Sequence, residues 1–389
     1  MNKQHWKYKK LGDICEVING FAFKSEKYVD KGIRVMRITN VQKGTIVDND
    51  PKYYPNEEAP NIRQYLLNEN DLLMSLTGNV GRVGLLQKKL LPAALNQRVA
   101  CLRIKSNDVL LKYLFHILDS DLFEKDCIFN SSGIAQKNMS TEWLKKYTIP
   151  VPPIAEQERI VAELDLLSGI IEKKKEQLKA YDQLAQSIFY TMFGDPIDNP
   201  KGWEVKKLGE VAMQKLSYGS GASAIQYNGR IRYVRITDIR EDGELNGDIV
   251  SPDTIDEKYL LNEGDILFAR SGATVGKTFQ YKSRYGNCIF AGYLIRMIPN
   301  IEIVLPSYIF AYTKSSYYRT FVSKAQNAVA QPNINAKQYS DLLVCVPPLS
   351  LQQEFAEKVE AIERQKALVQ QSIEETQTMF DYTMDKYFG

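Results

Sequence analysis

The sequence contains few of the residues from which metal and cofactor sites are usually built. Only two of its 389 residues are histidines, His5 and His116, and its five cysteines never form a Cys-x-x-Cys pair. Zinc sites are generally assembled from such residues, so the composition argues against a zinc centre. The scattered cysteines are typical of the reduced thiols of a cytoplasmic protein.

Long apolar runs and a strong charge imbalance are also missing. No stretch of 18 apolar residues exists, and the N-terminal segment MNKQHWKYKK has no apolar core, so we expect neither a membrane span nor a signal peptide. The formal net charge is only +3. This balance permits a basic face that binds nucleic acid but does not by itself indicate one. The length favours two or three domains.

The sequence contains partial matches to three catalytic motifs, and none of the three is complete. Residues 271–278, SGATVGKT, resemble a phosphate-binding loop, but serine replaces its first glycine. Residues 252–258, PDTIDEK, contain the residue types of a PD-(D/E)-x-K nuclease metal site. The acidic residues are too close together in the sequence to lie on two separate strands around a metal ion. The two Pro-Pro pairs lack the polar and aromatic neighbours of an adenine methyltransferase loop. We therefore expect no catalytic residue, metal ion or cofactor in this chain.

What the chain does contain is a tandem duplication. The segment VPPIAEQERI at 151–160 returns as VPPLSLQQEF 195 residues later. Further pairs keep the same order in both halves: WKYKKLGDI (6–14) and WEVKKLGEV (203–211), RITNV (37–41) and RITDI (235–239), LLNENDLL (66–73) and LLNEGDIL (260–267), GNVG (78–81) and GATVG (272–276). So many ordered matches exclude chance and indicate one repeated unit.

Each repeat combines a sheet-rich region with a long helix. Short β-type runs such as IRVMRITNV and IRYVRITDI are broken by turn residues over the first 150 or so positions of each half. The Val-Pro-Pro segments end these regions, because proline cannot donate to a β-ladder, and the helix begins just after them. We predict an α+β fold with globular domains at 1–152 and 197–347 and long helices within 153–196 and 348–389.

Both helical segments carry the a/d seam of a coiled coil. Seam positions recur at alternating steps of four and three. Its apolar members include Leu164, Leu167, Ile171, Leu178 and Ile188 in the first segment and Val359, Ile362, Val369, Ile373 and Phe380 in the second. Lys174, Lys366, Thr376 and Thr383 interrupt the seam. We expect the two helices to pair antiparallel, which would relate the halves by a pseudo-two-fold axis and suit two DNA half-sites about one helical turn apart.

The two halves differ most in their polar loops while agreeing in their framework. Arg, Lys, Asn, Gln, Ser and Tyr gather in segments such as 131–138 and 326–333. Arginine and the amide side chains suit hydrogen bonds to base edges, while lysine and serine suit phosphates. Two recognition domains that share one scaffold and bind different DNA sequences would have this pattern.

On these motifs the chain resembles the specificity subunits of type I restriction–modification systems. The resemblance rests on the duplicated Trp-x-x-x-x-Leu-Gly-Asp/Glu start, the Gly-x-x-Gly turn and the Pro-Pro entry into a long helix, and it covers nearly the whole chain. It implies two target-recognition domains, each reading half of a bipartite duplex DNA target. It also implies that the helices act as a ruler and dock two adenine-N6 methyltransferase subunits.

The same resemblance implies that this chain is not itself an enzyme. Methyltransferase subunits would bind S-adenosylmethionine, and a restriction/translocase subunit would bind and hydrolyse ATP with Mg. Expected DNA contacts in the first half are Lys24, Arg37, Thr39, Asn40, Ser75, Asn79, Arg82, Gln97, Ser132, Gln136, Lys137 and Asn138. Those in the second half are Tyr218, Ser220, Arg235, Thr237, Asp238, Arg270, Ser271, Lys277, Tyr293, Gln326, Asn327, Gln331 and Asn333.

Two other interpretations remain open from the sequence. A specificity subunit of a related modification system outside type I would share every feature, because the identity of the partner is not visible in this chain. A coiled-coil scaffold that binds no DNA would keep the helices but leave the divergent loops unexplained. A single-chain restriction–methylation enzyme is disfavoured by the incomplete motifs. Salt-sensitive binding to duplex DNA would separate the scaffold from both specificity interpretations.

Overall fold

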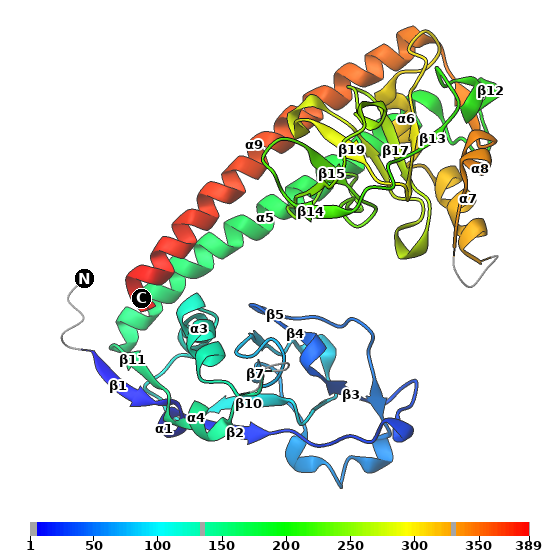
Figure 1. Cartoon of the computed structure of the whole chain (residues 1–389). Coiled ribbons are helices and arrows are strands. Elements are labelled where there is room, and N and C mark those ends of the chain that lie inside the picture. Colours follow the sequence, from blue (N-terminus) through cyan, green and yellow to red (C-terminus); the bar gives the residue numbers. More distant parts are fainter. Residues whose placement is uncertain (1–5, 133–136, 328–331, 389) are drawn as a thin grey trace. The chain divides into compact units, whose positions relative to one another are not determined.

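The chain divides into two compact units, each of which combines parts of both repeats. The computed structural model describes residues 6–132, 137–327 and 332–388, apart from the side chain of Asn327. Unit 1 comprises residues 1–173 and 373–389, and unit 2 comprises residues 174–372. Each unit therefore contains one globular domain, the beginning of the long helix that follows it and the end of the other long helix (Figure 1). None of the described helices is long and apolar enough to cross a membrane.

The globular domain of unit 1 is built on a four-stranded antiparallel sheet. Its strands lie in the order β2 (Cys15–Asn19), β10 (Val99–Ile104), β7 (Leu72–Ser75) and β8 (Val83–Leu85). A second sheet contains β6 (Tyr53–Tyr54), β3 (Ile33–Met36) and β9 (Ala93–Leu95), with β3 and β9 parallel. Two ribbons pair β1 (Lys7–Lys10) with β11 (Thr148–Val151) and β4 (Val41–Gln42) with β5 (Thr45–Ile46). Its helices are α1 (Leu11–Ile14), α2 (Leu111–Leu118), α3 (Asp121–Phe129) and α4 (Thr141–Lys146).

The globular domain of unit 2 repeats this plan. Its four-stranded sheet has the order β13 (Ser217–Tyr218), β20 (Leu294–Met297), β17 (Ile266–Ala269) and β18 (Thr278–Gln280). The parallel pair is β15 (Arg232–Val234) with β19 (Cys288–Phe290), and the end ribbon is β12 (Glu204–Lys207) with β21 (Leu343–Val346). β14 (Ala224–Gln226) pairs with β16 (Val250–Pro252), and the helices are α6 (Pro306–Tyr312), α7 (Ser316–Asn327) and α8 (Ala336–Ser340).

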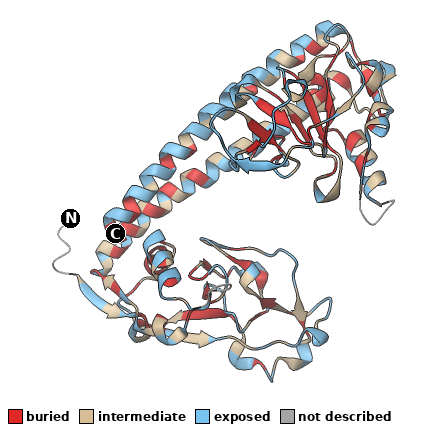
Figure 2. Ribbon diagram, in the orientation of Figure 1, coloured by how far each residue is buried: buried red, intermediate tan, exposed pale blue. Residues whose placement is uncertain are grey.

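The matching topology confirms the duplication and the predicted α+β class. In both units the main core lies between the four-stranded sheet and the helices that follow it, and the central strands are its most buried part (Figure 2). All four residues of β7 and of β17 are buried. Because both faces of these strands are buried, their sequences LLMS and ILFA are largely apolar. They lack the alternation of apolar and polar residues that is typical of a half-exposed strand.

The two long helices form where the heptad pattern predicts them. They are α5 (Ile154–Phe193) and α9 (Leu349–Phe388). None of the predicted seam side chains is exposed, and Leu164, Ile171, Ile362 and Ile373 are buried. Burial of one face along many turns supplies the stability that a long isolated helix lacks.

Within each unit the helices run antiparallel. In unit 1 the Tyr387 hydroxyl, near the end of α9, donates to the Glu163 carboxylate near the start of α5. In unit 2 Phe355, near the start of α9, packs against Phe189 and Phe193 at the end of α5, with ring centroids 5.9 and 5.2 Å apart. The beginning of each helix therefore lies beside the end of the other, as predicted.

Each of the two lysines of the seam bonds to a group on the other long helix. The Lys174 ammonium donates to the Ser372 carbonyl oxygen at 3.1 Å. The Lys366 ammonium bonds the carboxylates of Asp182 at 2.8 Å and Glu363 at 3.0 Å. Polar groups with specific partners favour one register of a coiled coil over others.

Candidate nucleic-acid interface

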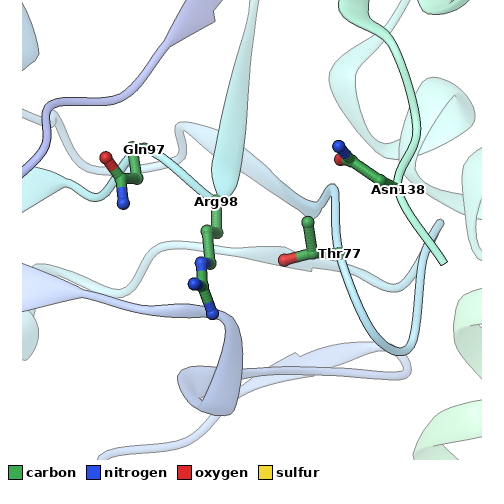
Figure 3. A pocket seen from close by; sticks show the side chains of 4 residues that line it. All are labelled: Thr77, Gln97, Arg98 and Asn138. Carbon is green, nitrogen blue, oxygen red and sulfur yellow. The ribbon is translucent and has the colours of Figure 1, made fainter. Parts of the chain in front are cut away.

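In unit 1, loops from separate strands converge on one polar surface. Thr77, Gln97, Arg98 and Asn138 line an open pocket (Figure 3). A second pocket is lined by Arg37, Ile38, Thr39, Asn96, Gln97 and Arg98. Because Gln97 and Arg98 line both pockets, the two lie next to each other. We name this surface, Arg37, Thr39, Thr77, Gln97, Arg98 and Asn138, loop surface 1.

Backbone hydrogen bonds hold the segments of loop surface 1 together. The loop after β7 and residues 137–139 are joined by a bond from the Gly78 N–H to the Lys137 carbonyl at 2.9 Å and by one from the Met139 N–H to the Leu76 carbonyl at 2.8 Å. Gly78 has φ +71°, a left-handed conformation in which glycine carries no steric cost. The Gly-x-x-Gly motif therefore makes the turn that brings Thr77 beside Asn138.

Most of the predicted contacts of the first half lie on or near the surface. Arg37, Thr39, Gln97 and Asn138 are part of loop surface 1, and Lys24, Asn79 and Ser132 are exposed elsewhere. Lys137 is partly buried. Arg82 is partly buried as well, and its guanidinium donates to the Gln42 side-chain oxygen at 2.9 Å. Gln136 lies outside the described residues.

Two predicted contacts of the first half are corrected by burial. Asn40 and Ser75 are each only 1% exposed. The Asn40 amide nitrogen donates to the Val47 carbonyl at 3.0 Å, and its oxygen accepts from the Arg37 N–H at 2.9 Å. The Ser75 hydroxyl donates to the Asn79 carbonyl. Both side chains therefore shape the turns beneath the surface and do not form part of it.

Thr77 and Arg98 were missed by sequence reasoning. Thr77 lies immediately before the repeated GNVG segment (78–81). Arg98 lies beside the predicted contact Gln97 and occupies the position of Tyr293 in the second half, which was predicted. Comparing the two halves position by position would have found both residues.

Unit 2 carries the corresponding surface. A β-bridge joins Ser271 to Asn333, as one joins Thr77 to Asn138 in unit 1. The Arg270 guanidinium donates to the Asn333 side-chain oxygen at 3.2 Å and lies 4.8 Å from the centroid of the Tyr218 ring. Tyr293 is 62% exposed, and its carbonyl accepts from the Arg270 N–H at 3.1 Å. We name Tyr218, Arg270, Ser271, Tyr293 and Asn333 loop surface 2.

The other predicted contacts of the second half have mixed positions. Thr237 and Gln326 are exposed. Arg235 is engaged by Asp238 and Asp248, at 2.7 Å each, and these bonds raise the pKa of its guanidinium. Lys277 forms an ion pair with Glu241 at 2.9 Å. Gln331 and the side chain of Asn327 lie outside the described part of the chain.

Burial corrects two predicted contacts here as well. Asp238 is 0% exposed, and besides binding the Arg235 guanidinium it accepts from the Arg235 N–H at 2.8 Å. Ser220 is buried, and its hydroxyl oxygen accepts from the Ala222 N–H at 3.1 Å. Asp238 is the counterpart of Asn40, so the same turn is stabilised by an amide in one half and by a carboxylate in the other.

Comparison with known proteins identifies the family. The model of the type I restriction modification DNA specificity domain matches the chain twice, over residues 3–180 and 200–377. The chain belongs to this family. The two matched regions correspond to the two repeats, each with its globular domain and part of its long helix.

Several specificity subunits resemble this chain, over most of its length or over about half of it. The EcoBI specificity subunit of Escherichia coli is 24% identical over 389 residues, covering 92% of this chain and 79% of the relative. The EcoAI subunit of the same organism is 32% identical over 186 residues, covering 46% and 31%. An S subunit structure from M. genitalium has a TM-score of 0.54 at 14% identity, over 99% of this chain and 96% of that one. A second structure, from work on assembly of a type I R-M system, also has a TM-score of 0.54, at 18% identity, over 98% and 97%. These structures show the same fold.

The specificity chain offers hydrogen-bonding groups at these surfaces but no assembled metal site. Within residues 6–132, 137–327 and 332–388, no three His, Cys, Asp or Glu side chains are grouped so that they could hold a metal ion. All five cysteines are free and buried, and burial raises the pKa of Cys15 to about 12 and that of Cys288 to about 11. These thiols remain protonated near neutral pH and are poor nucleophiles.

The long helices present apolar side chains on their outer faces. In unit 1 Leu166, Met379 and Tyr382 are exposed, and in unit 2 Leu184 and Leu368 are exposed. These residues lie outside the a/d seam, so the pairing of α5 with α9 does not use them. Their side chains are therefore available for contact with another protein.

Proposed function

We propose that this chain is the DNA-specificity subunit of a type I restriction–modification complex. Each loop surface reads one half of a bipartite duplex target. The observation that carries the proposal is the pair of loop surfaces itself. The two units have the same backbone framework, and in each unit a β-bridge joins the same two loop segments. At matched positions such as Arg98 and Tyr293, however, the side chains differ. Such an arrangement lets one fold recognise two different sequences.

The chemistry of the loop surfaces suits DNA. Loop surface 1 combines two arginines with amide and hydroxyl side chains, and loop surface 2 combines an arginine with tyrosines, a serine and an asparagine. Arginine forms paired hydrogen bonds to guanine, asparagine and glutamine form them to adenine, and hydroxyl groups bind phosphates or bases. Both surfaces carry exposed side chains that can form hydrogen bonds, as protein–DNA interfaces do.

The partners follow from the same proposal. The exposed apolar side chains of α5 and α9 dock two adenine-N6 methyltransferase subunits, and restriction/translocase subunits join through them. The specificity chain then performs no chemistry. S-adenosylmethionine, ATP and Mg bind to the partner subunits, and the complex works in the cytoplasm.

Co-expression of this chain with the methyltransferase that is encoded nearest to it tests the proposal. Mapping N6-methyladenine across the host DNA should reveal one split motif with two short specific halves around an unspecified gap. Replacing residues 1–152 by the corresponding domain of another specificity chain should change only one half of that motif. A stable complex that methylates unrelated single sites would contradict the bipartite proposal, and failure to bind methyltransferase or DNA would favour a scaffold.

A further inference from the structure

A rigid turn between β9 and β10 lies at the centre of loop surface 1. The N–H groups of Asn96 and Gln97 donate to the carbonyls of Met36 (3.1 Å) and Phe21 (2.9 Å), and the Arg98 carbonyl accepts from the Leu76 N–H at 2.9 Å. The Arg98 N–H donates to the Asn96 side-chain oxygen at 3.3 Å. Neighbouring strands therefore hold the backbone of the turn on both sides.

A glycine allows a neighbouring segment to approach this turn closely. A Cβ at Gly20 would come within 2.1 Å of the Asn96 carbonyl oxygen, so a larger residue would force the turn to move. Side chains on such a platform start from a defined position, which lowers the entropic cost of binding.

Arg98 is the arginine of this surface that remains available. The Arg37 guanidinium is bonded to the carbonyl and the carboxylate of Asp50, and the Arg82 guanidinium is bonded to Gln42. Arg98 is exposed, and among the described residues its guanidinium has neither an ion pair nor a hydrogen bond. In Figure 3 it extends into the pocket beside Thr77.

Unit 2 builds the same turn with different side chains. The N–H groups of Ala291 and Gly292 donate to the carbonyls of Val234 (2.9 Å) and Ser220 (2.7 Å), which correspond to Met36 and Phe21. Gly219 takes the place of Gly20, because a Cβ there would lie 2.3 Å from the Ala291 carbonyl oxygen.

The side chains carried by the two turns have different chemistry. The sequence Asn96-Gln97-Arg98 of unit 1 is replaced by Ala291-Gly292-Tyr293 in unit 2. The backbone of the turn is thus the same in both units. The guanidinium of Arg98 is replaced by the phenol of Tyr293, and the amide of Gln97 has no counterpart because Gly292 has no side chain.

We infer that Arg98 reads a guanine in the half-site bound by unit 1, and that residues 97–98 and 292–293 are the positions where the two half-sites are made different. This inference rests on the function proposed above. An unpaired guanidinium on a fixed turn can place two parallel N–H donors on the O6 and N7 acceptors of guanine, the commonest specific contact of arginine in the major groove. Tyr293 offers a single hydroxyl and cannot make this paired contact.

The test compares Arg98→Ala and Arg98→Lys with Arg63→Ala in the full complex with methyltransferase. Arg63 is also an exposed arginine of unit 1, but it lines a separate pocket with Glu16 and Tyr65. We expect both Arg98 variants to lose preference for guanine at one position of one half-site by about tenfold or more, measured from N6-methyladenine maps. The lysine variant keeps the charge but lacks the planar fork, so its preference falls as well.

The remaining outcomes separate this inference from the proposed function. If Arg98→Ala lowers methylation equally at all sites while Arg98→Lys restores it, Arg98 binds phosphate and the inference is wrong, although the function stands. An unchanged motif in both variants overturns the inference equally. If the wild-type complex shows no bipartite motif, the proposed function fails and the inference fails with it. Arg63→Ala should leave the motif and its level of methylation unchanged.

Discussion

At the scale of single residues, the two units place opposite charges at one matched position. Asp119 follows α2 and lies against Gly44, while Lys314 follows α6 and lies against Gly243. Burial is the main cause of both pKa shifts. It raises the pKa of Asp119 to about 7 and lowers that of Lys314 to about 8. In both cases the charged form is disfavoured in the folded state because it has lost contact with water.

Asp119 should therefore make unit 1 less stable as the pH rises. Its pKa is higher in the folded chain than in the unfolded chain, so the folded state binds more protons between about pH 4 and 7, and stability falls across this window. The variant Asp119→Asn removes the buried charge. We expect it to raise the free energy of unfolding at pH 8 by about 1–3 kcal/mol, and by less at pH 5. Denaturant unfolding at the two pH values measures this difference.

Asp121→Asn provides the matched control. A hydrogen bond to Lys43 lowers the pKa of the Asp121 carboxyl, so its charge stabilises the folded state. This variant should be slightly less stable than wild type at pH 8. A stabilising effect of equal size in both variants would mean that removal of any acidic charge, and not burial at position 119, explains the result.

At the scale of elements, each long helix begins on a buried glutamine. The Gln157 side chain bonds the carbonyls of Asp108 and Pro152, at 2.7 and 2.8 Å, and accepts from the Leu110 N–H at 2.9 Å. Gln352 makes the matching three bonds in unit 2. The glutamine after each Pro-Pro pair therefore ties the first turn of the helix to its own globular domain.

Replacing Gln352 by alanine should loosen this junction. Leu305 N–H, Ile303 carbonyl and Pro347 carbonyl would each lose a partner in the interior, which costs about 2–4 kcal/mol of stability in unit 2. Thermal unfolding combined with hydrogen exchange in residues 303–312 measures the loss. Gln353→Ala, at the exposed neighbouring position, should have little effect. Equal losses in both variants would show that helix propensity, and not the buried bonds, is responsible.

At the scale of the whole molecule, the C-terminal end of the chain completes the core of unit 1. Met384, Tyr387 and Phe388 are buried in one cluster with Ile160 and Leu164 of α5. The Phe388 ring lies 5.7 Å from that of Tyr113 in α2. Residues that follow the second globular domain in sequence thus stabilise the unit that contains the first.

Tyr387→Ala should therefore destabilise the distant half of the sequence. Tyr387 is fully buried, and its removal leaves a cavity that costs about 3–5 kcal/mol. We expect faster amide exchange in α2 (111–118), with little change in α6 (306–312), when exchange is measured by mass spectrometry. Asp385→Ala, exposed on the same helix, is the control. Faster exchange in α6 alone would contradict the division into these units.

The sequence by itself determined the duplication, the α+β class, both long helices and their seam. These features depend on local periodicity and on order along the chain, which a single sequence displays directly. Four predicted contacts, Asn40, Ser75, Ser220 and Asp238, were assigned to the surface because their residue types suit DNA. Only tertiary structure showed that turns bury them, since burial depends on segments far apart in the sequence.

Tertiary structure also decided which loops share a surface and which arginine is available. Arg37, Arg82 and Arg98 look alike in the sequence, but the first two are bonded to Asp50 and Gln42 from other segments. It likewise assigned residues 373–389 to unit 1, because antiparallel helices bring the end of one beside the start of the other. Periodicity predicts that a helix needs a partner, whereas long-range packing decides which residues meet.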